Sequence, residues 1–332
     1  MPPARNQKFA FGNPRLGGGT ENKMSYTKRE YKVASSDGIH RLAGFVYLPE
    51  GEAKGFFHIA HGMTEYIERY ERILGDMANE GYICFGYDHL GHGKTVNDKS
   101  ELGFIADKGG YDLLCRDIKV FSDAVRAEFD PEGRLPYYLM GHSMGSFISR
   151  LSTERYVRPD KLIVMGTGGG NPAAPIGIAL MSVIGLFKGK RHISRLAYKL
   201  AFGGYNTKFK SEDNASEQSW LSTDLSIRDK YRKDEYCTFK FSVSAMGDLM
   251  KLLKECNRGA WFKNMPRIPI LLVAGSDDPV GNYGKGVREV EKKLRACGHN
   301  VDCVIYEGAR HEILNDFCYD TVKADILSFL NR

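Results

Sequence analysis

Short apolar runs alternate with segments of helical apolar spacing along most of the chain. The runs are typical of strands buried on both faces of a sheet, and they occur at residues 55–60, 82–88, 136–141, 162–167 and 269–275. Helical spacing at 70–81 and 110–129 predicts helices between them. A last strand is expected at 301–308, before a final helix from about Ile313 to Leu330. Repeated strand–helix units predict an α/β fold, with a mostly parallel central sheet and helices on both of its faces.

Three segments depart from this rhythm. Residues 31–48 predict a hairpin with its turn at Asp37-Gly38. From Gly170 to about Lys251, helical patterns continue without a clear strand. We therefore predict a helical cap inserted after the sixth strand, at residues 171–250, with a core formed by residues 27–170 and 251–332. Residues 1–26 are polar, lack the apolar segment of a secretory signal, and are predicted to be a flexible leader.

Charge and cysteine content narrow the function classes. The net charge of +6 falls largely within residues 1–30, which carry six Lys/Arg and two acids, so the rest is nearly neutral. Nucleic acid would need a basic face on the folded body, and we do not expect it as a partner. Seven cysteines without a C-x-x-C motif favour a reducing compartment. No apolar run reaches the ~18 residues that span a bilayer, so we expect a cytoplasmic protein.

One chemical motif stands at the end of a predicted strand. Gly141-His142-Ser143-Met144-Gly145 matches G-x-S-x-G, with a strand pattern before it and a helical pattern after it. In this motif the serine occupies a sharp strand-to-helix turn, and small flanking residues let strand and helix approach closely. Backbone N–H groups at the start of the helix can stabilise an oxyanion. We therefore interpret Ser143 as a nucleophile rather than an ordinary turn residue.

A serine nucleophile needs a base, and the base needs an orienting acid. In hydrolases with this motif the chain order is serine, then acid, then histidine. Asp277 and Asp278 follow one late strand, and His311 follows the next. The carboxyl ends of parallel strands meet at one edge of a sheet, so we expect Ser143, one of the two aspartates and His311 to lie together.

The oxyanion would need a second donor, from the loop after the third strand. An His61-Gly62 pair stands at that loop. We predict that the backbone N–H groups of Met63 and Met144 are the two donors.

Several segments together resemble the lysophospholipase and monoacylglycerol-lipase group of α/β-hydrolases. The resemblance covers about residues 27–330, is specific in the core and vague in the cap. It rests on HIAHGMTEYIERY (58–70), YDHLGHGKT (87–95), GHSMGS (141–146), AGSDDPVG (274–281) and YEGARHEILND (306–316). It implies an α/β-hydrolase fold with Ser143 as nucleophile, His311 as base and Asp278 as acid, Asp277 ranking second. Met63 stands where relatives often have a small residue, which implies a narrower acyl pocket.

Two other patterns are interpreted without a ligand. A metal cluster is suggested by His58, His61, Asp88, His89, His92 and His142. We expect instead a loop after the fourth strand whose polar groups bond to backbone, and the resemblance accounts for this loop without a metal. Gly168-Gly169-Gly170 lacks the Lys-Ser/Thr of a phosphate-binding loop, and we expect it to be the entry to the cap. No metal or cofactor is therefore predicted.

The predicted cap joins an apolar segment at 175–187 to a basic one. Residues 171–210 contain seven Lys/Arg and no acid. We predict that an acyl-binding wall is formed by Leu180, Val183, Ile184 and Leu186. The cap is also expected to touch an anionic membrane surface through Lys188, Lys190, Arg191 and Arg195. The alternative is a cap packed on the body with a solvated basic face.

The sequence favours a serine hydrolase that cleaves carboxylic esters through an acyl-enzyme on Ser143. The apolar cap favours monoacylglycerol or lysophospholipid-like substrates. The alternatives are a general short-chain carboxylesterase, a thioesterase or acyltransferase, and an aminopeptidase. The last would need a cap acid for the substrate amine, and Glu212, Asp213 and Glu217 are available. A non-catalytic small-molecule-binding protein would not need the three side chains of the predicted site.

Overall fold

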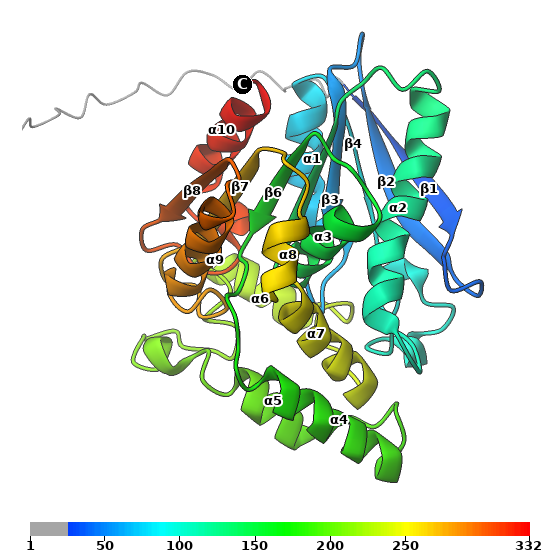
Figure 1. Ribbon diagram of the computed structural model, residues 1–332. Coiled ribbons are helices and arrows are strands. Elements are labelled where there is room, and N and C mark those ends of the chain that lie inside the picture. Colours follow the sequence, from blue (N-terminus) through cyan, green and yellow to red (C-terminus); the bar gives the residue numbers. More distant parts are fainter. Residues whose placement is uncertain (1–25) are drawn as a thin grey trace, which may run out of the picture.

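Eight strands form one sheet in the computed structural model, which describes residues 26–332 (Figure 1). Their order is β1-β2-β4-β3-β5-β6-β7-β8. The pairs β1–β2 and β2–β4 are antiparallel, and every later pair is parallel. The strands are β1 (Tyr26–Ala34), β2 (Arg41–Pro49), β3 (Gly55–Ala60), β4 (Tyr82–Tyr87), β5 (Tyr137–His142), β6 (Lys161–Met165), β7 (Ile270–Gly275) and β8 (Val301–Tyr306).

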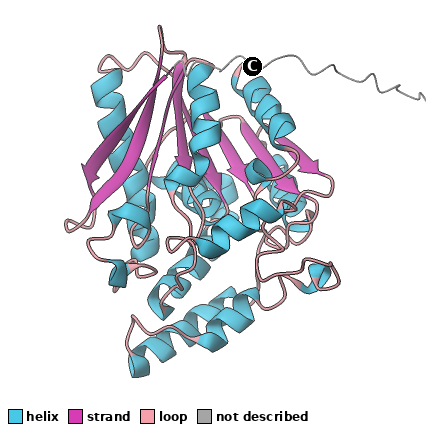
Figure 2. Cartoon of the chain, turned by 180° about the vertical axis from the view of Figure 1, so that it is seen from behind, coloured by secondary structure: helices cyan, strands magenta, loops and turns pink. Residues whose placement is uncertain are grey.

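The central strands are apolar because helices cover both faces of the sheet (Figures 1 and 2). Successive side chains of a strand point to opposite faces, so Phe56 and Phe57 of β3 belong to different cores. The core around Phe57 includes α1 (Glu71–Asn79) and α10 (Tyr319–Leu330). The core around Phe56 includes α2 (Gly110–Phe129), α3 (Met144–Arg155), α8 (Gly259–Asn264) and α9 (Lys285–Ala296). The predicted α/β-hydrolase fold is confirmed.

A group of helices between β6 and β7 lies beyond the carboxyl ends of the parallel strands (Figures 1 and 2). It consists of α4 (Ala174–Lys188), α5 (Arg195–Phe202), the 3-10 helix η4 (Thr207–Phe209), α6 (Leu225–Lys233) and α7 (Val243–Glu255). This arrangement confirms a helical cap after the sixth strand. The predicted boundary at residue 250 falls inside α7, which packs on α4 as well as on α2 and α3 of the core. The division into domains stays a prediction.

The local predictions differ from the structure mainly at the final helix. The predicted hairpin is present, with nine residues in each strand. The predicted final helix is divided into the 3-10 helix η5 (Ile313–Asn315) and α10, because Asp316 between them is extended and its carboxylate accepts backbone N–H groups, including that of Arg310. Three further 3-10 helices are η1 (Ile67–Tyr70), η2 (Gly93–Thr95) and η3 (Lys99–Glu101). The predicted leader lies outside the described residues except for Tyr26.

Candidate active site

Ser143 occupies the turn between β5 and α3 in a strained conformation. Its φ is 53° and its ψ is −121°, a backbone conformation that residues other than glycine rarely adopt. Its backbone is held on both sides: the N–H donates to Met165 O at 3.0 Å, and the carbonyl accepts from Ser146 N–H at 2.9 Å. The turn thus presents the residue at the end of the sheet and at the N-terminus of α3.

Two glycines of the motif are required by close backbone contacts. A Cβ atom on Gly145 would lie 2.1 Å from the carbonyl oxygen of Ala60, and one on Gly141 would lie 2.2 Å from that of Gly145. Both distances are far below van der Waals contact with rigid backbone. The strand and the helix therefore meet at a separation that no larger residue permits, as the motif predicts.

His311 follows β8 and is paired with a carboxylate from the loop after β7. Its Nδ1 lies 2.9 Å from Oδ2 of Asp278, and both side chains are buried. The other carboxylate oxygen, Oδ1, accepts the N–H of Val280 at 2.8 Å. Asp277 instead forms an ion pair with Lys208 of the cap and is partly exposed. Of the two aspartates, the structure thus brings Asp278 to the histidine.

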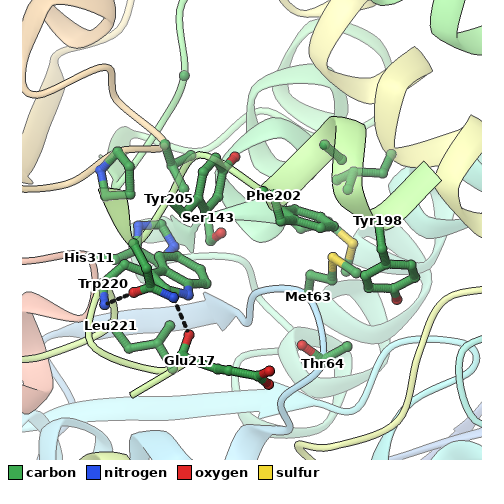
Figure 3. A pocket seen from close by; sticks show the side chains of 18 of the residues that line it. Met63, Thr64, Ser143, Tyr198, Phe202, Tyr205, Glu217, Trp220, Leu221 and His311 are labelled. Carbon is green, nitrogen blue, oxygen red and sulfur yellow. Dashed lines mark hydrogen bonds between the residues drawn. The ribbon is translucent and has the colours of Figure 1, made fainter. Parts of the chain in front are cut away.

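Ser143 and His311 line the same cavity, which has a volume of about 1830 Å³ and lies between the core and the cap (Figure 3). In the described part of the chain, no hydrogen bond joins the Ser143 hydroxyl to the His311 ring, and such contacts often form only with substrate present. The indole of Trp220 packs on His311 with ring centroids 5.0 Å apart. Trp220 continues a row of aromatic side chains that lines the cavity: Tyr198, Phe202 and Tyr205.

The two residues predicted to supply the oxyanion donors, Met63 and Met144, also line this cavity. Met63 follows β3, and Met144 is the first residue of α3, where a backbone N–H has no partner within the helix. Within residues 26–332 we find no acceptor for either N–H. The preceding N–H, that of Gly62, donates to Oε1 of Glu65 at 2.5 Å and fixes the loop that carries Met63.

The predicted acyl wall is only partly in the cavity. Leu180 lines it, but Ile184 packs against the hydrophobic core, and Val183 and Leu186 are 52% and 79% exposed. The prediction was therefore wrong for Val183, Ile184 and Leu186. The physical reason is that α4 is apolar around most of its circumference, so its periodicity does not show which face meets the cavity.

The histidines after β3 and β4 bond mainly to backbone. Nδ1 of His61 lies 2.8 Å from Gly62 O, and Nδ1 of His92 lies 2.9 Å from Leu90 O. Burial lowers the pKa of His61 to about 4 and that of His92 to about 3, so both rings are neutral at pH 7. Within residues 26–332, no three His, Cys, Asp or Glu side chains are grouped to hold a metal ion.

Sequence reasoning missed a set of charged side chains beneath this site. Arg69 lies 2.7 Å from Glu65 and 2.7 Å from Glu312, and Glu65 also contacts His142. The spacing of Glu65 and Arg69 was visible in the sequence. Their burial was not, because charged residues in a polar loop are usually solvated.

The family follows from comparison with known proteins. A family model described as serine aminopeptidase, S33, matches residues 51–317. The chain belongs to this family. The monoglyceride lipase homolog of Monkeypox virus is 26% identical to this S33-type hydrolase over 276 residues, covering 82% of this chain and 87% of the viral protein. The monoglyceride lipase of Saccharomyces cerevisiae is 23% identical over 327 residues, covering 93% and 96%.

A solved esterase structure is also similar to this hydrolase. A thermostable carboxyl esterase from Bacillus coagulans, in complex with glycerol, matches with a TM-score of 0.85 and 28% identity over 92% of this chain and 98% of the esterase. The predicted resemblance to the monoacylglycerol-lipase group is confirmed. The prediction of a carboxylic ester hydrolase is confirmed at the level of the family.

Proposed function

We propose that this protein is a serine hydrolase of carboxylic esters, with Ser143 as nucleophile, His311 as base and Asp278 as the orienting acid. The observation that carries the proposal is the 2.9 Å contact between Asp278 and His311, beside the cavity that Ser143 faces. A carboxylate on Nδ1 leaves Nε2 as the ring nitrogen that can take the proton of the serine.

The reaction follows from these roles. His311 removes the hydroxyl proton of Ser143 as the serine oxygen attacks the ester carbonyl. The resulting oxyanion accepts hydrogen bonds from the N–H groups of Met63 and Met144. The imidazolium, stabilised by Asp278, then gives its proton to the leaving alcohol, and an acyl-enzyme remains. A water molecule, deprotonated by His311, attacks this ester and releases the carboxylic acid and the free serine.

For the substrate we propose a long-chain monoacylglycerol or a lysophospholipid-like monoester. The cavity exceeds the ~300–1000 Å³ of most small-molecule sites. Apolar side chains of the cap helices α4, α5 and α7 line it: Ile176, Leu180, Met181, Phe202, Met246, Leu249, Met250 and Leu253. Burying an acyl chain against them favours binding by about 25 cal/mol for each Å² removed from water, so long chains are preferred to short ones.

We also propose that the cap works against an anionic lipid surface. Seven apolar side chains of α4, α5 and the segment between them are 48–80% exposed: Ile176, Val183, Leu186, Phe187, Ile193, Leu196 and Leu200. We call these residues the cap patch. Ile176 and Leu200 also line the cavity, so the cavity reaches this patch. A lipid could then enter without crossing water.

The charges around the cap patch divide into two groups. Lys188, Arg195 and Lys199 are exposed and free to meet anionic headgroups. Lys190 bonds to Asp107 O, and Arg191 packs over the ring of Phe104, so these two are held by the core. No helix within residues 26–332 has the length and apolar content to cross a bilayer. A cytoplasmic location with peripheral membrane contact stays our prediction.

A second candidate is cleavage of an N-terminal residue from a peptide. Glu212 is engaged with Arg228 and Arg310, but Asp213 and Glu217 line the cavity, and neither forms an ion pair within residues 26–332. Either carboxylate could hold a substrate amine. An aminoacyl anilide therefore belongs in the test.

The test is a substrate series with a labelling control. p-Nitrophenyl esters from C2 to C16, a monoacylglycerol, a lysophospholipid and an aminoacyl anilide are compared by kcat/KM, and a fluorophosphonate probe is mapped by mass spectrometry. We expect labelling at Ser143, a rise in kcat/KM with chain length, and a loss of about 10⁴-fold or more in Ser143→Ala with an unchanged fold. Labelling elsewhere, or an active alanine variant, would refute the nucleophile.

A further inference from the structure

Five side chains form a closed cluster beneath the proposed active site: Glu65, Arg69, Tyr70, His142 and Glu312. Glu65 comes from the loop after β3, Arg69 and Tyr70 from η1, His142 from the end of β5, and Glu312 from the loop after β8. All are buried except Arg69, whose side chain is 12% exposed. We call this set the buried cluster. It joins the three loops that carry the proposed nucleophile, base and oxyanion donor.

The hydrogen bonds of His142 fix where its protons lie. Nε2 is 3.1 Å from the carbonyl oxygen of His311, which can only accept, so Nε2 carries a hydrogen. Nδ1 is 2.7 Å from the hydroxyl oxygen of Tyr70 and 3.3 Å from Oε1 of Glu65. The Tyr70 hydroxyl donates to Oε1 of Glu65 at 2.8 Å, so its oxygen is free to accept. All of these contacts are satisfied together only if Nδ1 also carries a hydrogen.

The charge balance of the buried cluster leads to the same protonation state. Glu65 and Glu312 are two negative charges, and Arg69 is one positive charge. With a neutral His142, the buried cluster would hold one uncompensated negative charge, and an isolated buried charge is strongly unfavourable. With a protonated His142, the charges sum to zero.

The pKa shifts agree with this account. Burial alone would lower the pKa of His142, but its hydrogen bond to Glu65, the charges of Glu65 and Glu312, and the carbonyl of His311 raise it above its ordinary value. Burial would raise the pKa of Glu65, but His142 and Arg69 hold it far below its ordinary value.

The other groups around His142 do not replace its charge. His61, on the Glu65 side, is neutral and faces Gly62 O, and Tyr231 of the cap covers the guanidinium of Arg69. The ring of His311 packs on that of His142 with centroids 4.7 Å apart and is bonded to Asp278.

We propose that His142 is an imidazolium at neutral pH and a positioning residue, which holds His311 through its backbone carbonyl and Met63 through Glu65. The link to Met63 runs through Oε1 of Glu65, which accepts the N–H of Gly62. His311 is thereby fixed twice, at its ring by Asp278 and at its backbone by His142. The proposal rests on the proposed function for its kinetic consequences, but not for the protonation state itself.

The decisive measurement is the ring protonation of His142 in the wild-type protein. We expect a 15N-histidine-labelled sample at pH 7 to show one buried histidine with hydrogens on both ring nitrogens, and His142→Gln should remove that signal. A neutral His142 in the active enzyme would overturn the proposal. The protonation state is measured in the wild-type protein without substrate, and the variant serves only to assign the signal. Failure of this proposal can therefore be told apart from failure of the proposed function, which would appear as missing fluorophosphonate labelling at Ser143.

The kinetic test uses hydrolysis of p-nitrophenyl butyrate between pH 6 and 10. The raised pKa of His142 means that its charge is present below that pKa and lost above it, so kcat should fall at alkaline pH. Glu65→Gln should move this fall to lower pH and reduce kcat at pH 7 by roughly 10–100-fold, as expected for a misplaced catalytic group, with a KM within about threefold. Tyr70→Phe should have a smaller effect in the same direction.

The matched control is His299→Gln. His299 is also buried and also faces a backbone carbonyl, with Nε2 2.8 Å from Phe262 O, but it lies outside the cavity and the buried cluster. The variant His299→Gln should leave the fall of kcat at alkaline pH unchanged. An unshifted profile and unchanged kcat in Glu65→Gln, or an equal shift in His299→Gln, would contradict a positioning role.

Discussion

Two adjacent aspartates have different surroundings, and we expect them to have different roles. Asp278 is fully buried, accepts the N–H of Val280 and faces Nδ1 of His311. Asp277 points to the cap, where it pairs with Lys208, whose side chain is 51% exposed. An exposed ion pair contributes about 0–1 kcal/mol to stability. A carboxylate that holds the tautomer of a base affects every turnover.

We therefore expect very different losses from the same isosteric substitution. Asp278→Asn should lower kcat by about 10⁴-fold, because an amide favours the wrong tautomer of His311 and cannot stabilise the imidazolium. Asp277→Asn should lower kcat less than about threefold, as expected for loss of an exposed ion pair. Steady-state kinetics on p-nitrophenyl butyrate, with thermal unfolding of both variants, would decide. A more severe loss in Asp277→Asn would assign the acid role to that residue.

The residues of the site differ in how far sequence alone could find them. Ser143 and His311 could be predicted because a motif and a chain order mark them, whereas the choice between the two aspartates needed the resemblance. The roles of these residues stay proposals. His142 and Glu65 could not be recognised as partners, because they lie 77 residues apart in the chain. No local pattern records that a charge is buried.

At the scale of elements, the sequence predicted the sheet well and the cap poorly. Buried parallel strands carry continuous apolar runs with glycine-containing turns after them, so β3 to β7 could be predicted. Which side chains of α4 are buried could not be predicted. Met181 is buried and Ile184 packs on the core, while Leu186 and Phe187 are 79% and 80% exposed. Only the packing of α4 on α7 distinguishes these residues.

We expect the exposed face of α4 to affect binding to lipid surfaces and not hydrolysis of soluble esters. We expect the double variant Leu186→Asp, Phe187→Asp to bind anionic vesicles at least about 10-fold more weakly, because a buried side chain of this size contributes about 1.5–3 kcal/mol. Hydrolysis of soluble p-nitrophenyl acetate should be unchanged, while hydrolysis of a long-chain monoacylglycerol in vesicles should fall. Vesicle co-sedimentation at low and high salt and the ratio of the two activities measure this.

Two single variants test whether the effect is specific to the cap patch and is not a loss of stability. Ile39→Asp makes the same kind of change at a 75% exposed site in the turn between β1 and β2, and it should alter neither activity. Ile184→Asp buries a charge against the core, so it should lower stability and both activities together. Unchanged vesicle binding in the double variant would rule out the cap patch as the lipid-facing surface.

The whole molecule contains several histidines that are kept neutral by burial. The pKa of His58 is lowered to about 3, that of His61 to about 4 and that of His92 to about 3, and that of His89 lies well below its ordinary value. Each takes up a proton when the chain unfolds below pH ~6.5, so its contribution to stability is present above that pH and lost as the pH falls.

Three buried carboxyls act in the opposite direction. Burial raises the pKa of Asp88 and of Asp248 to about 6, and it also raises the pKa of Asp117. Between pH ~6 and ~3.8 the folded state holds more of these protons than the unfolded state does, so the contribution of these carboxyls to stability grows as the pH falls. Near pH 5, the proton uptake of the four histidines on unfolding exceeds the proton release from the three carboxyls, which leaves a net uptake.

We therefore predict that the free energy of unfolding falls as the pH drops from 6.5 to 5, independently of catalysis. His58 is the cleanest residue for a test, because its ring stacks on Phe85 at 4.4 Å in the core, outside the cavity. His58→Phe keeps a ring there and removes one titrating group, so it should reduce the slope of stability against pH by about one proton. Urea unfolding at a series of pH values measures the slope, and Ser143→Ala, which should abolish turnover, should keep the wild-type value. A wild-type stability that is flat from pH 7 to 5, or a slope unaltered by His58→Phe, would mean that buried neutral histidines do not set the acid limit of this fold.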